Sequence, residues 1–271
     1  MKNRKLVLYI LLSYGITWIL WIPLLINYQW GANLKILPAQ FYLASFGPLL
    51  GAVLTTLFCD GFKGLKMWFS RTYSLTFSKK WLAIAILMPI CYGIIGVVAH
   101  RVITGIWPDW SQFGLTQKLP GFNLWQTALV WITTFGLGEE SGWRGFLLPE
   151  LNKRFSLRIS SLIVAGIWIL WHLPAFWFNE TYLNMGPGIL GWAISLSFGS
   201  VLLAWLSKGS RFSVIPVLIW HGGFDLITAS DQAAEVMAMV CSMLVILQGI
   251  YLIRNMARSE VKEKDQVKKT K

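Results

Sequence analysis

Residues 124–144 read LWQTALVWITTFGLGEESGWR, an apolar run that ends in two adjacent acids and an arginine. Glu139 and Glu140 close the run, and Arg144 comes four residues after Glu140. Carboxylates at the edge of hydrocarbon are costly, and the chain otherwise keeps charge out of its hydrophobic segments. We therefore expect this stretch to be a membrane span whose charged end carries the function.

The rest of the chain has the composition of a membrane protein. Hydrophobic residues make up 55% of the 271 residues, whereas charged residues make up only 13%. A helix needs about 20 apolar residues to cross roughly 30 Å of hydrocarbon. The sequence thus predicts an all-α polytopic membrane protein with about eight transmembrane helices, at residues 6–26, 40–59, 81–99, 122–140, 159–178, 187–206, 212–229 and 235–253.

The basic residues are distributed unevenly between the expected loops. If the N-terminus is cytoplasmic, 21 of the 24 lysines and arginines fall on the cytoplasmic side, and the other side holds only Lys35, Arg101 and Lys118. Cytoplasmic loops carry such an excess. We therefore predict an integral protein of the cell membrane with both termini in the cytoplasm. The net charge of +12 then indicates membrane lipids as a partner and no nucleic acid.

The chain shows no long linker and no evident internal repeat, so we expect a single transmembrane domain over residues 1–257. Within this domain, residues 122–230 form the core that bears the motifs. Residues 258–271 are rich in lysine, of mixed charge and without aromatic side chains. Such a composition predicts a disordered, basic cytoplasmic tail.

Three apolar segments carry polar groups, and within two of these segments the polar groups are spaced one helical turn apart. Glu140 and Arg144 are four residues apart, so on a helix they share a face and can form an ion pair, while Glu139 projects about 100° away. Two later segments carry one histidine each, His172 and His221, and Asp225 follows His221 by one helical turn. We expect the three segments to contribute to one buried site.

Each feature also has a simpler interpretation. The two acids can mark the solvated end of the fourth span, and His172 can be a hydrogen-bonded packing residue. The pair of His221 and Asp225 is harder to explain by packing, because an unpaired Asp at the centre of a span costs roughly 2.5–3.5 kcal/mol on insertion scales. This pair therefore favours a functional site.

Together these groups suit the hydrolysis of an amide by water. A carboxylate in a partly desolvated pocket can take a proton from water, and neighbouring imidazoles can orient the water and donate hydrogen bonds to an oxyanion. The sequence contains no G-x-S-x-G nucleophile elbow and no H-E-x-x-H motif. The missing elbow, with no cysteine beside the histidines in sequence, disfavours a covalent acyl-enzyme, and the zinc-protease motif is absent as well.

Three motifs in this order resemble a known family. They are E-E-x-x-x-R at residues 139–144, W-x-x-x-H at 168–172 where the family has F-x-x-x-H, and H-x-x-x-D at 221–225 where the family has N or D. In a polytopic chain they resemble the CAAX prenyl protease and bacteriocin-processing (CPBP, or Abi) family of intramembrane endopeptidases. The resemblance covers about residues 122–230.

The resemblance implies an intramembrane endopeptidase that hydrolyses a peptide bond of a membrane-associated or lipidated protein or peptide. Glu139 would be the general base, and His172 would help to hold the attacking water. His221 and Asp225 would face the oxyanion, which requires Asp225 to be protonated. An ionised Asp225 would instead orient His221 or help to bind a cation.

The same resemblance gives Glu140 and Arg144 supporting roles. It also leaves open whether a metal ion is bound. The family is often described as metalloproteases, and two histidines with a carboxylate can bind Zn²⁺. The residues for such an ion would be Glu139, His172 and His221.

Two other functions stay open at this stage. A proton-coupled transporter could use intramembrane Glu, His and Asp as a relay, although many transporters have a two-fold repeat that is not evident here. A non-proteolytic immunity or scaffold protein could also retain the motifs.

Overall fold

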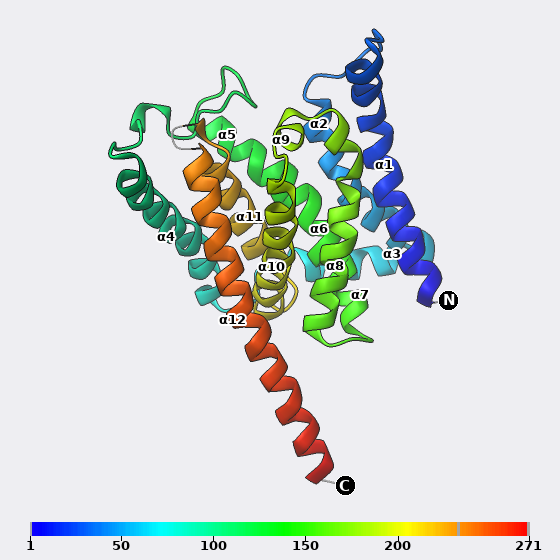
Figure 1. Ribbon diagram of the computed structural model, residues 1–271. Helices are drawn as coiled ribbons and strands as arrows, with labels where there is room; N and C mark the ends of the chain where they lie inside the picture. Colours follow the sequence, from blue (N-terminus) through cyan, green and yellow to red (C-terminus); the bar gives the residue numbers. More distant parts are fainter. Residues whose placement is uncertain (1, 232–233, 270–271) are drawn as a thin grey trace.

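The computed structural model describes residues 2–231 and 234–269, and within these residues the secondary structure is helical, without a strand (Figure 1). The helices form one bundle, and the predicted all-α, polytopic membrane fold is confirmed. Within the described residues, six apolar segments are long enough to cross a membrane: Arg4–Trp30, Gln40–Thr72, Lys79–Thr104, Leu157–Trp177, Gly188–Gly209 and Glu235–Arg258.

These segments correspond to six of the eight predicted spans. The helices that form them are α1 (Lys2–Trp30), α2 (Gln40–Leu43) with η1 (Ala44–Phe46) and α3 (Gly47–Thr72), α4 (Lys79–Thr104), α8 (Leu157–Trp171) with η5 (Leu173–Trp177), α10 (Gly188–Gly209), and α12 (Ala234–Lys269).

The predicted spans 122–140 and 212–229 differ from regular transmembrane helices. The second is α11 (Ile215–Thr228), which is apolar but has only 14 residues. The first continues as far as residue 152 and changes its helical type four times. Its parts are α5 (Leu124–Trp131), the π-helix η3 (Ile132–Glu139), α6 (Glu140–Gly142), the π-helix η4 (Trp143–Leu147) and α7 (Leu148–Asn152).

The bundle places these two irregular spans in its interior. α1 packs along α3, α10 packs on α8 and α12, and α11 packs on both α4 and η3. In Figure 1, α1 and α4 lie at opposite ends of the bundle, and α5, α6, α8, α10 and α11 lie between them. Short η2 (Trp110–Gln112) and α9 (Glu180–Leu183) belong to loops at the upper side of this view. Both chain ends lie toward the opposite, lower side.

The last described residues, 258–269, extend α12. α12 continues without a break to Lys269, so the backbone of residues 258–269 is helical. Glu260 in this segment forms an ion pair with Arg158 near the start of α8, at 3.2 Å. This contact ties the extension of α12 to the bundle, and it could not be foreseen from the composition of the tail.

Gly61 bends α3 into two halves. Its φ of 67° and ψ of −172° are not helical, and this combination belongs to a region that essentially only glycine adopts. Residues 47–60 precede the bend and residues 62–72 follow it. A Cβ at Gly61 would meet no heavy atom within 4 Å, so any effect of a side chain there comes from backbone strain alone.

We expect Gly61→Ala to lower the free energy of unfolding by about 1–3 kcal/mol, because alanine is strained in this backbone conformation. Reversible denaturation of the detergent-purified protein measures the change. Gly15→Ala is the matched control, since Gly15 is helical and a Cβ there also meets nothing within 4 Å. Equal stability of the two variants would show that Gly61 is not under this constraint.

Candidate active site

Two glycines let the backbones of η3 and α11 touch. A Cβ built at Gly136 would lie 2.7 Å from the carbonyl oxygen of Leu218, and one at Gly222 would lie 2.7 Å from Cα of Ile132. No side chain fits at either position without moving the main chain. Gly222 directly follows His221, and its lack of a side chain permits this close approach of a second backbone. It brings the acids at the end of η3 next to His221.

The carboxylate of Glu140 is the centre of a buried charge network. Its Oε1 accepts a hydrogen bond from Nη1 of Arg144 at 2.8 Å, as the four-residue spacing predicted. The same oxygen lies 2.9 Å from Nδ1 of His221. Both Glu140 and Arg144 have an exposed fraction of 0%. The guanidinium also lies over the ring of Trp168, 4.4 Å from its centroid, which adds a cation–π contact.

Glu139 points elsewhere, as the angle between adjacent helical residues predicted. Its Oε2 accepts a hydrogen bond from Nε1 of Trp168 at 2.7 Å, and the side chain is buried. Trp168 therefore holds Glu139 with its ring edge and Arg144 with its ring face. The sequence identified Trp168 only as the aromatic residue of the second motif. An indole N–H is a donor that needs a partner when buried, and that signal could have suggested the contact.

His172 ends α8 and has a defined orientation. Its Nδ1 lies 2.8 Å from the carbonyl oxygen of Trp168, and because a carbonyl only accepts hydrogen bonds, Nδ1 carries the proton. In a neutral ring, Nε2 is then an acceptor. Three aromatic rings surround the imidazole, with centroids 4.7 Å (Trp171), 5.2 Å (Trp192) and 5.8 Å (Tyr182) away.

Asp225 lies one turn beyond His221 on α11. Its Oδ2 is 3.6 Å from Nε2 of His221, so the imidazole lies between this carboxyl group and that of Glu140. The side chain of Asp225 is 22% exposed, in contrast to the fully buried side chain of Glu140. The predicted pairing of His221 with Asp225 is present, but the contact with Glu140 was not foreseen.

A cavity of about 660 Å³ collects four of the six predicted residues. Glu139, His172, His221 and Asp225 line it, whereas Glu140 and Arg144 do not. The two acids are thus separated: one faces the cavity and the other holds the ion pair behind it. Aromatic side chains form much of the remaining wall, among them Trp21, Phe41, Trp131, Trp171, Tyr182 and Trp192.

The cavity extends away from the chain ends. Its lining includes Lys118, which lies between α4 and α5, and Asn179 and Thr181 at the start of α9, which Figure 1 shows at the upper side of the bundle. It also extends between α10 and α12, where Met239 and Met243 line it and are 51% and 57% exposed. The cavity therefore reaches both a loop surface and an apolar side of the bundle.

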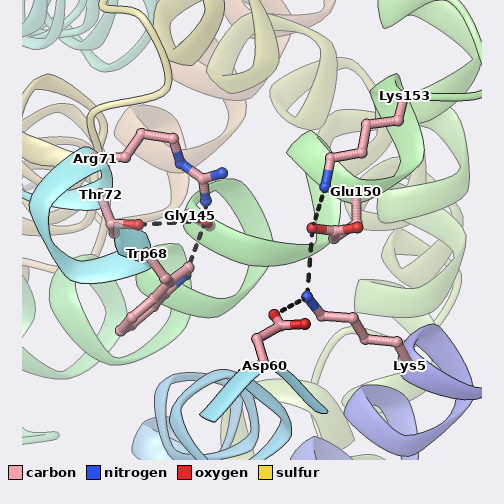
Figure 2. A network of polar contacts seen from close by, with 8 residues as sticks. All are labelled: Lys5, Asp60, Trp68, Arg71, Thr72, Gly145, Glu150 and Lys153. Carbon is pink, nitrogen blue, oxygen red and sulfur yellow. Dashed lines mark hydrogen bonds and ion pairs between the residues drawn. The ribbon is translucent and has the colours of Figure 1, made fainter. Parts of the chain in front are cut away.

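Polar contacts join the helices on the side of the chain ends (Figure 2). The carbonyl oxygen of Gly145 in η4 accepts hydrogen bonds from Trp68 Nε1 at 3.0 Å, Arg71 Nη2 at 2.5 Å and Thr72 Oγ1 at 3.4 Å. Nearby, Lys5 of α1 pairs with Asp60 of α3 and with Glu150 of α7, and Lys153 also pairs with Glu150. None of these residues lines the cavity.

The arrangement of donors does not fit a shared metal ion. Nδ1 of His221 contacts Glu140, its Nε2 faces Asp225, and Oε2 of Glu139 accepts from Trp168. Across residues 2–231 and 234–269, no three His, Cys, Asp or Glu side chains are placed to hold an ion together. Zn²⁺ stays a prediction of the family resemblance.

Comparison with known proteins gives the same assignment as the motifs. Residues 120–227 match the family model described as type II CAAX prenyl endopeptidase Rce1-like. Over 88 residues the chain is 31% identical to CAAX prenyl protease 2 of Methanococcus maripaludis. This alignment covers 31% of the chain and 32% of the relative, so it spans about a third of the curated protein. The segment that bears the three motifs, residues 120–227, is thus similar to type II CAAX prenyl endopeptidases, in agreement with the resemblance of those motifs.

Proposed function

We propose that the chain is an intramembrane endopeptidase that hydrolyses a peptide bond with water activated by Glu139. One observation carries the proposal: a buried carboxylate faces a cavity that two histidines from other helices also line. A general base needs such a position, within reach of both water and substrate. The matched family and the name of the curated relative support the same reaction.

The proposed reaction assigns a step to each group. Glu139 takes a proton from water while Nε2 of His172 accepts a hydrogen bond from the same water and orients it. The oxygen adds to the peptide carbonyl, and protonated Asp225, beside His221, donates a hydrogen bond to the resulting oxyanion. When the C–N bond breaks, protonated Glu139 returns its proton to the leaving amine. Glu140 and Arg144 hold His221 in place.

The shape of the cavity supports a membrane-associated substrate. Its opening between α10 and α12 is lined by methionine and aliphatic side chains, which suit an apolar chain entering from lipid. The curated relative is named a prenyl protease, and a lipidated peptide is the corresponding substrate class for this chain. A proton relay across the membrane is less well supported, because the two-fold repeat of many transporters is not evident in the sequence.

We expect Glu139→Gln to reduce peptide hydrolysis by about 10²–10⁴-fold, because glutamine cannot accept the proton from water. The detergent-purified protein is assayed with a panel of membrane-anchored and C-terminal peptides. Thermal unfolding should be close to wild type, since the amide oxygen can still accept the hydrogen bond from Trp168. Wild-type turnover in this variant would disprove the general-base role.

Glu140→Gln is the matched control, because it makes the same chemical change one residue along. It leaves the buried guanidinium of Arg144 without its carboxylate, a loss that typically costs about 3–5 kcal/mol. We therefore expect the main defect to be in stability. If the two variants are alike in both stability and activity, the division of roles between the two acids is wrong.

Asp225→Asn should keep hydrolysis within about threefold of wild type, because an amide N–H can replace the proton donated by a neutral carboxylic acid. Asp225→Ala removes the group and should lower hydrolysis about 10²–10³-fold, as loss of one oxyanion donor does. Rates for the two variants are compared at equal folded protein concentration. A loss in Asp225→Asn as large as in Asp225→Ala would indicate that the ionised carboxylate is required.

We also propose that both chain ends are cytoplasmic in the cell membrane, in agreement with the distribution of basic residues. A membrane-impermeant thiol reagent added to intact cells should then label Gly31→Cys and Asn184→Cys but not Lys66→Cys. The three variants are made in a chain that lacks the native cysteines Cys59, Cys91 and Cys241. If only Lys66→Cys were labelled, the chain ends would lie on the outer side of the membrane and the proposed orientation would be wrong.

A further inference from the structure

An open groove lies in the angle of the bend in α3. It has a volume of about 720 Å³, and its lining comes from both halves of the helix and from the residue that follows it. Val53 contributes from the first half, which belongs to a membrane-spanning segment. The residues of the second part are Phe62, Leu65, Lys66, Trp68, Phe69, Ser70 and Tyr73.

The second half of α3 has an unusual surface. Phe62, Met67 and Phe69 are 81%, 61% and 60% exposed, and the exposed Lys63 and Lys66 lie among them. Large apolar side chains mixed with lysines are the composition of a helix at the boundary between lipid headgroups and acyl chains. The bend at Gly61 turns this segment away from the direction of the membrane-spanning half.

The two lysines are available to a ligand. Among residues 2–231 and 234–269, neither Lys63 nor Lys66 forms an ion pair, and the neighbouring Asp60 pairs with Lys5. Basic residues beside an apolar groove complement a molecule with a negative headgroup and a hydrocarbon chain. On the charge distribution, this part of the chain faces the cytoplasmic leaflet, where anionic lipids are found.

We propose that this groove is a binding site for one anionic phospholipid. The acyl chain lies along Val53 and Leu65, between the exposed phenyl rings, and Lys66 and Lys63 bind the phosphate. The groove and the catalytic cavity share no lining residue, so this is a second site. It does not depend on the proposed peptidase activity.

The wall of the groove is connected to the helical segment that carries Glu139 and Glu140. Trp68 donates its indole N–H to the carbonyl oxygen of Gly145, next to Arg144, and Tyr73 donates its hydroxyl to Oγ of Ser141 at 2.8 Å. A lipid that orders this half of α3 therefore also supports the segment that holds Glu140 and Arg144.

Native mass spectrometry of the detergent-purified full chain tests the site. Dioleoyl phosphatidylglycerol and dioleoyl phosphatidylcholine are added at the same concentration, and the number of lipid molecules bound to each protein is determined. We expect preferential binding of one phosphatidylglycerol. Lys63→Gln and Lys66→Gln together should lower its occupancy, with an affinity loss of about fivefold for each lysine removed.

The double variant Lys79→Gln, Lys80→Gln is the matched control, because it removes the same charge at the start of α4, outside the groove. It should retain wild-type lipid binding. Equal loss in both double variants, or equal binding of the zwitterionic lipid, would overturn the proposal. If the first double variant does not fold, Lys66→Gln alone, which changes one exposed side chain, decides the question. Peptide hydrolysis is not measured, so failure here leaves the proposed function untouched.

Discussion

The architecture depends on one buried carboxylate, that of Glu140, which is shared between Arg144 and His221. Buried charged side chains are tolerated only when each has a partner, and removing one partner leaves the remaining charges uncompensated. The network therefore fixes η4 and α11 relative to α6, since any shift of these elements would separate the charges. Trp168 extends the constraint to α8 through its contact with the guanidinium and its hydrogen bond to Glu139. The geometry of the candidate site and the packing of the helices are consequently set by the same contacts.

The π-helical turns of the interrupted span make this arrangement possible. π-helices are rare and often mark functional sites, because the wider turn changes which residues share a face. Glu139 ends η3 and faces the cavity, while Glu140 begins α6 and turns toward the ion pair. Close backbone contact at Gly136 and Gly222 then lets His221 of α11 reach Glu140. A regular helix with bulkier residues could not bring His221 so near.

The sequence predicted the parts of the site that follow from local spacing. The ion pair of Glu140 with Arg144 and the pair of His221 with Asp225 both follow from the four-residue period of a helix. The joining of three segments followed from the cost of isolated polar groups in hydrocarbon. The π-turns, the short α11 and the hydrogen bond from Trp168 to Glu139 depend instead on packing between segments distant in sequence. Hydropathy alone could not reveal them, because an apolar run looks the same whether its helix is regular or interrupted.

The site is asymmetric across the bundle, and this asymmetry suits hydrolysis. On the side of the chain ends, the carbonyl of Gly145 and the ion pairs of Glu150 join α1, α3 and α7. On the other side, the cavity reaches loops that carry Lys118 and Asn179, and laterally it extends to α10 and α12, where the exposed Met239 and Met243 line it. A peptidase in a membrane must admit water and an apolar substrate to one carboxylate, and two different openings can supply them separately. Under the proposed function, water would arrive from the polar loops and the substrate from lipid.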